Sequence, residues 1–312
     1  MRKLLSLVVV LALGTSLAAC GSDDKKAADD FGKSGIKVTE EFGKKPTVTH
    51  REGEPDKALV TEVLKEGNGP EVKKGELMVA QYLGQIWRDG KVFDNSYDRG
   101  APASFPIGVG RVVTGWDEGL VGKKAGSRVL LSIPPDKGYK EQGNPDAGIQ
   151  GTDTLIFVVD IIGAFDLTKK PSGGTPATVP AGNPTVTGPL TAEAKVTVPK
   201  GYKAPAKNSV PIIITKGTGK PLEKNTMLET NYTIFDYTGK KQFSTFDPSQ
   251  ESPTPGPVAQ PIAPTGAQNA GALANLVGVP LGSRILMHLP PQQGQAAFVV
   301  LDLIDSMPIS PA

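Results

Sequence analysis

The sequence predicts an α+β fold in which an antiparallel β-sheet is combined with a short helix. Apolar residues alternate with their neighbours in 128–133 and 155–161, and a period of two is typical of β-strands. Only residues 112–121 place apolar side chains at helical spacing, with Gly122 following as a stop signal. One short helix against several strands indicates an α+β arrangement.

An internal duplication predicts that this unit occurs twice. Residues 120–135 recur as residues 276–291 at a constant offset of 156, and Tyr82 has a counterpart in Tyr232 at an offset of 150. The repeated unit is about 110 residues long, which is a whole domain and not a short solenoid repeat.

The first 19 residues have the pattern of an export signal. Arg2 and Lys3 precede an apolar run that ends in small residues before Cys20, which is the order of segments in a signal peptide. The site resembles a bacterial lipobox, which implies a diacylglyceryl group on Cys20, and two acyl chains suffice for stable attachment. We therefore expect an extracytoplasmic protein that is lipid-anchored to the bacterial cell membrane. A plain signal peptide with an incidental cysteine, or an uncleaved signal anchor, is the alternative.

Residues 1–19 are the expected lipoprotein signal peptide. In the rest of the chain, shifts in composition mark the domain boundaries. Residues 20–45 are polar and charged and predict a flexible stalk, and residues 167–194 are rich in Pro, Gly and Thr, which predicts a semi-rigid linker. These boundaries leave 46–166 and 195–307 as the two domains.

Charge and composition exclude several kinds of partner. Without Arg2 and Lys3 the 34 basic residues become 32, which equals the number of acidic residues. A neutral chain lacks the basic surface of nucleic-acid-binding proteins, so we expect no nucleic-acid partner. Two histidines and a single cysteine argue against a zinc site. We expect neither a metal nor another cofactor.

Aromatic residues between 82 and 157 recur in short motifs without a nucleophile and base beside them, so we expect binding and bond rotation instead of covalent catalysis. The motifs are Tyr82-Leu83-Gly84, Gly90-Lys91-Val92-Phe93-Asp94, Gly115-Trp116-Asp117-Glu118-Gly119-Leu120 and Thr154-Leu155-Ile156-Phe157. Over residues 59–165 the chain resembles the FKBP-type peptidyl-prolyl cis-trans isomerases. The resemblance implies that each domain is a curved antiparallel half-barrel wrapped around one short helix.

The resemblance also implies an apolar substrate pocket. Trp116 matches the pocket floor, and Phe93 and Phe157 match its walls. Val112 and Val113 match its rim, where the backbone N–H of Val113 would donate to a substrate carbonyl.

Further positions complete the implied site. Tyr139 matches the tyrosine that hydrogen-bonds the carbonyl before proline, Ile149 lies at the tip of the same loop, and Phe105 belongs to the substrate-binding residues. Asp94 matches the pocket carboxylate, which would be held by Tyr82 and Arg99. An ion pair of Asp94 and Arg99 that only stabilises the sheet is the alternative, and both roles are compatible.

The family's chemistry needs no reactive group. Rotation about an X–Pro bond interrupts amide resonance at a barrier of about 18–20 kcal/mol, and an apolar pocket favours the less polar twisted state over the planar one. The chain departs from the family at Ala103, at Asn144 and at an extra residue, Gly148, before Ile149. We therefore expect activity with lower affinity or a shifted sequence preference. The resemblance extends to macrolides such as rapamycin or tacrolimus as ligands.

The second domain lacks much of this site. Ala272 stands at the position of Trp116, and Ser244 stands at that of Asp94. We therefore expect a catalytically silent, degenerate FKBP-like domain. The sequence predicts an isomerase that acts on proline-containing exported polypeptides. A non-catalytic FKBP-like chaperone or binding scaffold is the alternative.

Overall fold

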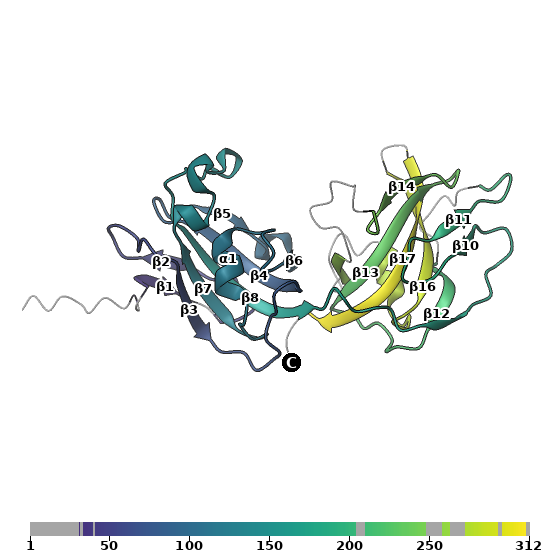
Figure 1. Cartoon of the computed structure of the whole chain (residues 1–312), viewed down its shortest axis with the longest axis horizontal. Coiled ribbons are helices and arrows are strands. Elements are labelled where there is room, and N and C mark those ends of the chain that lie inside the picture. Colours follow the sequence, from purple (N-terminus) through teal and green to yellow (C-terminus); the bar gives the residue numbers. More distant parts are fainter. Residues whose placement is uncertain are drawn as a thin grey trace, which may run out of the picture. The chain divides into compact units, whose positions relative to one another are not determined.

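The computed structural model describes residues 31, 34–39, 41–203, 210–247, 258–262, 272–292 and 295–309. The described strands form two large antiparallel sheets and two separate two-stranded hairpins (Figure 1). The expected signal peptide and Cys20 lie outside the described residues. No helix in the described part of the chain has the length and apolarity needed to span a membrane.

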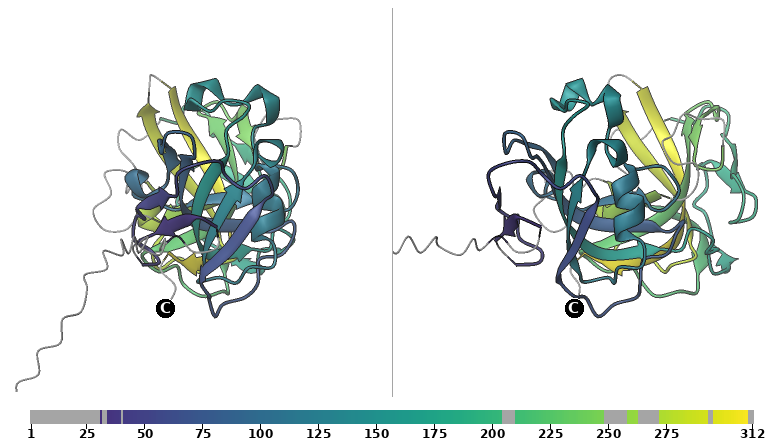
Figure 2. Two further views of the ribbon diagram at one scale, coloured as in Figure 1. Left: turned by 90° about the vertical axis from the view of Figure 1, so that its left-hand side faces the viewer. Right: turned by 60° about the vertical axis from the view of Figure 1, so that its left-hand side comes forward.

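The first large sheet has six strands and one α-helix, as expected. Its order is β3-β7-β8-β4-β5, and β6 pairs with β4. The helix α1 (Thr114–Leu120) follows the extended residue Val113 and packs against β7 (Figures 1 and 2). The strands are β3 (Val60–Lys65), β4 (Leu77–Ile86), β5 (Val92–Asn95), β6 (Ala103–Pro106), β7 (Arg128–Ile133) and β8 (Leu155–Phe165).

Four short 3-10 helices lie in the loops of this first half. One follows β5, and three interrupt the long connection between β7 and β8. They are η1 (Tyr97–Arg99), η2 (Pro135–Lys137), η3 (Lys140–Gln142) and η4 (Pro145–Ala147).

The N-terminal segment is more ordered than the sequence predicts. Part of residues 20–45, expected to be a flexible stalk, forms β1 (Ile36–Val38), which pairs with β2 (Val48–His50). Ile36 and Val48 are buried against Leu130 of the sheet. The stalk prediction is therefore wrong for the part that forms β1, because the hairpin covers apolar side chains on one face of the sheet.

The second large sheet has seven strands in the order β14-β13-β17-β16-β12-β9, with β15 beside β13. The short helix of this half is the 3-10 helix η5 (Ala272–Leu276). The strands are β9 (Gly174–Pro176), β12 (Ile212–Gly217), β13 (Thr226–Asp236), β14 (Lys241–Ser244), β15 (Val258–Ile262), β16 (Arg284–Gln292) and β17 (Gln295–Pro308).

The expected linker, residues 167–194, is also incorporated into this fold. Residues in it form β9, which pairs with β12, and β10 (Thr185–Thr187), which pairs with β11 (Lys195–Thr197). Val186 is buried against the second sheet. The Pro/Gly/Thr-rich segment is therefore not a free spacer, because its few apolar residues cover apolar strand residues.

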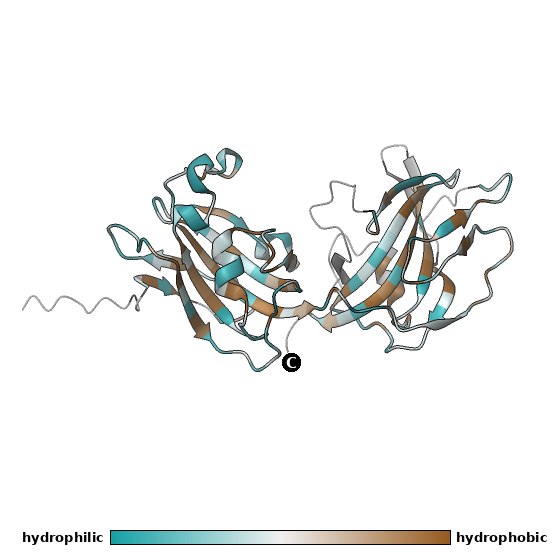
Figure 3. Cartoon of the chain, in the orientation of Figure 1, coloured by the Kyte–Doolittle hydropathy of each residue, from teal (hydrophilic) through white to brown (hydrophobic). Residues whose placement is uncertain are grey.

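Both large sheets bury apolar residues on both faces. In β7, Val129 and Leu131 belong to the core beneath α1, whereas Leu130 belongs to the cluster beneath β1 and β2. All six β7 residues are consequently buried, although alternation alone predicts one solvated face. In Figure 3 hydrophobic residues gather on the strands and hydrophilic residues mainly in the loops.

Candidate active site

The expected pocket residues come together on the α1 side of the first sheet. Four of them are almost fully buried, at 3–5% exposure: Tyr82, Trp116, Ile149 and Phe157. Partly buried residues pack against these four: Phe93, Phe105, Val112, Val113 and Tyr139. One apolar cluster therefore contains every apolar or aromatic residue that the sequence predicted for the site.

Trp116 lies at the centre of this cluster. Its ring contacts those of Phe105, Phe157 and Tyr82 at centroid distances of 4.8, 5.2 and 5.6 Å, all in edge-to-face geometry. Such pairs contribute about 0.5–1.5 kcal/mol each beyond their buried area. The indole N–H of Trp116 is buried and has no hydrogen-bond partner among the described residues. Because buried polar groups are usually paired, this N–H is an available donor at the floor of the site.

The wall formed by Phe93 and Phe157 depends on Gly84. The two rings meet edge to face at 5.5 Å. A Cβ atom on Gly84 would lie 2.7 Å from the Phe93 ring and 2.8 Å from the Phe157 ring. Both distances are shorter than real Cβ contacts, so glycine at this β4 position makes room for the aromatic wall.

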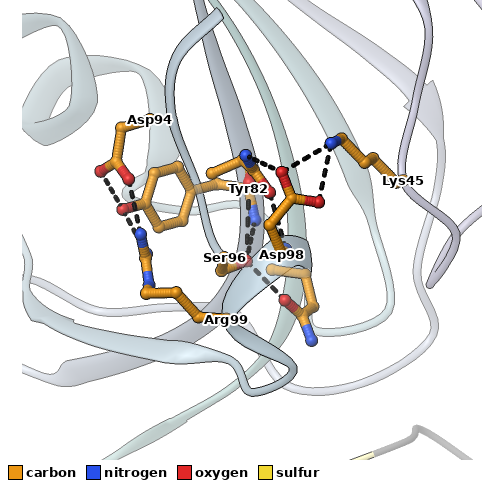
Figure 4. A network of polar contacts seen from close by, with 8 residues as sticks. Lys45, Tyr82, Asp94, Ser96, Asp98 and Arg99 are labelled. Atoms are coloured by element: carbon orange, nitrogen blue, oxygen red, sulfur yellow. Dashed lines mark hydrogen bonds and ion pairs between the residues drawn. The ribbon is translucent and has the colours of Figure 1, made fainter.

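Asp94 lies beside the cluster in a three-residue polar network (Figure 4). It accepts hydrogen bonds from the Tyr82 hydroxyl and from Arg99 Nη1, and Arg99 Nη2 also contacts the Tyr82 oxygen at 2.7 Å. Burial and then the hydrogen bond to Asp94 raise the pKa of Tyr82 to about 12. Tyr82 therefore remains a neutral donor at physiological pH and fixes the carboxylate at the edge of the site.

The rim before α1 is held by Asp117, a role that the sequence analysis missed. Its carboxylate accepts from the backbone N–H groups of Gly108 and Gly110 at 2.6 and 2.7 Å. Both glycines have positive φ angles, 77° and 74°, which other residues rarely adopt. The motif Gly108-Val109-Gly110 is the sequence signal from which this role of Asp117 could have been predicted. The motif shapes the loop that leads to Val112 and Val113.

Val113 presents a free backbone donor at this rim. It is the N-cap of α1, and its carbonyl accepts from Trp116 N at 2.9 Å. Its own N–H makes no hydrogen bond to another described residue. The predicted donor to a substrate carbonyl is therefore available.

The long β7–β8 loop carries Tyr139 and Ile149. Asn144 and Ile149 exchange two backbone hydrogen bonds of 2.9 Å, which fold the loop tip back on itself. The loop base is held by Asp153, which accepts from Arg88 Nε at 2.9 Å and from the N–H of Gln150 at 2.7 Å. Arg88 and Asp153 are 65 positions apart, so no local pattern predicts their contact.

No group of three or more His, Cys, Asp or Glu side chains suitable for a metal ion occurs among the described residues. The site offers aromatic surface, an oriented carboxylate and hydrogen-bond donors. This arrangement can bind a peptide and exclude water from it.

Comparisons with known proteins agree with the geometry. A family model described as FKBP-type peptidyl-prolyl cis-trans isomerase matches residues 69–162. An FK506-binding protein from Streptomyces anulatus is 38% identical over 118 residues, which are 38% of this chain and 95% of that protein. The chain belongs to the FKBP-type peptidyl-prolyl cis-trans isomerase family. FK506-binding protein 1A of Aspergillus fumigatus is 44% identical over 106 residues, 33% of this chain and 93% of its own length.

Among solved structures, the crystal structure of FkpA from Escherichia coli is 34% identical, covers 43% of this chain and 53% of its own, and has a TM-score of 0.33. The expected enzyme class, an FKBP-type isomerase, is confirmed by the family match and the relatives. For the matched region, the expected antiparallel sheet with one helix is also confirmed.

Proposed function

We propose that the site around Trp116 accelerates rotation about X–Pro bonds without a covalent intermediate. The observation that carries the proposal is the edge-to-face aromatic cluster with Asp94 fixed at its margin. A proline ring that packs against Trp116, Phe93 and Phe157 would be desolvated. The planar amide is charge-separated and the twisted amide is less polar, so desolvation favours the twisted state.

Hydrogen bonds orient the peptide in this proposal. The N–H of Val113 and the hydroxyl of Tyr139 donate to carbonyls on either side of the proline, and Asp94 sets the approach of the backbone. Phe105, Val112 and Ile149 shape the surface that contacts flanking residues. Asp94 is fixed by Tyr82 and Arg99, and Ile149 by its backbone hydrogen bonds to Asn144, so these groups need little reorganisation when the substrate binds.

The second half, residues 195–307, is proposed to be a degenerate FKBP-like repeat without activity. Ser244, at the position of Asp94, is buried and contacts Thr233 at 3.1 Å. Tyr232 and Phe243 stack on each other at 5.3 Å with an interplanar angle of 28°. These contacts fill the second core with its own side chains, which supports a silent site.

Substitutions in the full chain test the site and the silent repeat together. Trp116→Ala removes the pocket floor and should reduce kcat/KM for a short prolyl peptide by at least tenfold, as expected for loss of a transition-state contact. Phe243→Ala is the matched control in the second half and should retain activity. Circular dichroism verifies that both variants fold. Full activity in folded Trp116→Ala would contradict the proposal.

A binding scaffold with poor turnover is the second candidate, and it is favoured by the departures at Ala103 and Asn144. Aggregation of an unfolded client protein distinguishes the two. A scaffold suppresses aggregation without measurable isomerisation, whereas the enzyme accelerates proline-limited refolding. The relatives are named for FK506, and we propose that the Trp116 site also binds this class of macrolide.

We further propose that the mature protein is lipid-anchored at Cys20 outside the cytoplasm and acts on exported polypeptides. The support is the N-terminal sequence pattern, with positive charges, an apolar run and one cysteine. Cys20→Ser should move the protein from the membrane fraction to the soluble fraction and abolish labelling by radioactive palmitate. Unchanged labelling would exclude Cys20 as the lipidation site.

A further inference from the structure

The 3-10 helix η1 lies between the N-terminal segment and the pocket carboxylate. It begins three residues after Asp94 and carries Arg99, which orients that carboxylate. We propose that Lys45 is a positioning residue for the isomerase, because it fixes η1 and through it the pair of Arg99 and Asp94 (Figure 4). This inference rests on the proposed role of Asp94 in substrate binding.

The pair of Asp94 and Arg99 cannot hold its geometry by attraction alone. The two side chains are 43% and 48% exposed, although they approach to 2.5 Å. Exposed ion pairs gain little because water screens them and because two long side chains lose conformational freedom. The orientation of Arg99 therefore depends on how firmly the backbone of η1 is held.

Contacts with the strands hold η1 on its inner side. The N–H of Ser96 donates to the carbonyl of Tyr82 at 3.0 Å, and Ser96 Oγ accepts from the Tyr82 N–H at 2.8 Å. The hydroxyl of Tyr97 donates to Asp160 Oδ2 at 2.9 Å. These bonds fix the beginning of η1. Asn95 also holds Asp98 from within the loop, because its Nδ2 donates to Asp98 Oδ2 at 2.9 Å and its Oδ1 accepts from the Asp98 N–H at 2.8 Å.

The N-terminal segment supplies the outer support. Lys45 Nζ donates to both carboxylate oxygens of Asp98, at 2.7 and 2.8 Å. Two residues earlier, the Gly43 N–H donates to the same Asp160 oxygen that accepts from Tyr97, at 2.6 Å. One short stretch of the N-terminal segment thus contacts η1 directly and also through the buried carboxylate of Asp160.

Lys44 provides a matched control for Lys45. Its side chain is 66% exposed, and its ammonium group lies 3.9 Å from Glu41 Oε2. Lys44→Ala therefore removes the same charge from the same segment without touching Asp98. Lys45→Arg retains a cation that can pair with both Asp98 oxygens.

The test compares kcat/KM of the full chain and its variants on a short prolyl peptide. Lys45→Ala should lower kcat/KM about two- to fivefold, which corresponds to the free energy that an exposed ion pair contributes. Lys44→Ala should remain at the wild-type value, and Lys45→Arg should restore most of the loss. Asp98→Asn, which removes the carboxylate charge from the other side of the contact, should reproduce the Lys45→Ala loss.

A double-mutant cycle separates positioning from general stabilisation. If Lys45 acts through Asp94, Lys45→Ala causes no further loss in an Asp94→Ala background. Losses that multiply in the double variant, or a Lys45→Ala variant with wild-type activity, would overturn the inference and leave the proposed site intact. Wild-type activity of Asp94→Ala would instead overturn the role of Asp94 and this inference with it.

Discussion

At the scale of single residues, the aromatic wall of the pocket depends on the absence of a side chain at position 84. The resemblance to the FKBP family implied Asp94, Tyr82 and Arg99 as a set, and the structure brings them together. Gly84 was identified only as part of a motif. Position 84 must be glycine because the rings of Phe93 and Phe157 meet beside it. These two residues are 64 positions apart in the chain, and local sequence carries no sign of their contact.

Gly84→Ala should therefore damage the site. The new methyl group would overlap both rings, which must rotate or separate, and overpacking of this kind costs about 1–3 kcal/mol. We expect a lower midpoint of chemical denaturation and a lower kcat/KM. Gly173→Ala is the control, because a Cβ there meets nothing within 4 Å and its φ is not positive. Equal effects of the two substitutions would show that Gly84 has no special role.

At the scale of elements, each large sheet is covered by a two-stranded hairpin, β1–β2 in the first half and β10–β11 in the second. Buried Arg128 pairs with Asp160 at 2.6 Å, and Arg284 pairs with Asp302 at the same distance. Arg128 also donates to the carbonyl of Lys44, as Arg284 does to carbonyls of the segment between β10 and β11. The two halves therefore share this contact, and in each half it reaches into a segment whose polar composition predicted a stalk or a linker.

The β7–β8 loop gives a pH-dependent prediction at this scale. Burial alone would raise the pKa of Asp153, but the hydrogen bonds from Arg88 and the Gln150 N–H outweigh it and hold the pKa below its usual value. A lowered folded-state pKa contributes stability above the unfolded value, near 4, and this contribution is lost as the pH falls through the folded value. Asp153→Asn should therefore reduce the free energy of unfolding at pH 7. The reduction should be only about 1 kcal/mol, because the Arg88 side chain is partly exposed and water screens its charge.

The difference between the wild type and Asp153→Asn should shrink as the pH falls below about 4. Denaturant unfolding at several pH values measures it. The same variant should raise KM more than it lowers kcat, because the loop that carries Tyr139 and Ile149 loses its support. A difference that is constant from pH 7 to pH 3 would contradict the assignment.

At the scale of the whole molecule, the proposed degenerate repeat predicts one functional site per chain. Trp116 and Asp94 have no chemical equivalents in the second half, where Ala272 and Ser244 occupy their positions. We predict that the chain binds one equivalent of FK506. Isothermal titration calorimetry measures this stoichiometry, and Trp116→Ala should abolish the heat signal. Two equivalents per chain would show that the second half also has a functional pocket.

The sequence by itself determined the alternating strands around 128–133 and 155–161 and the α-helix, and its motifs, through the family resemblance, identified the members of the aromatic cluster. These depend on side-chain period and on short motifs, both of which are local. Only the tertiary structure decided that the supposed stalk and linker cover the sheets, that Asp117 shapes the rim and that Arg88 holds the loop. The contacts that cover the sheets and hold the loop join residues far apart in the chain, such as Gly43 and Asp160, which are separated by 117 positions. Their energy depends on three-dimensional proximity, which composition and spacing do not encode.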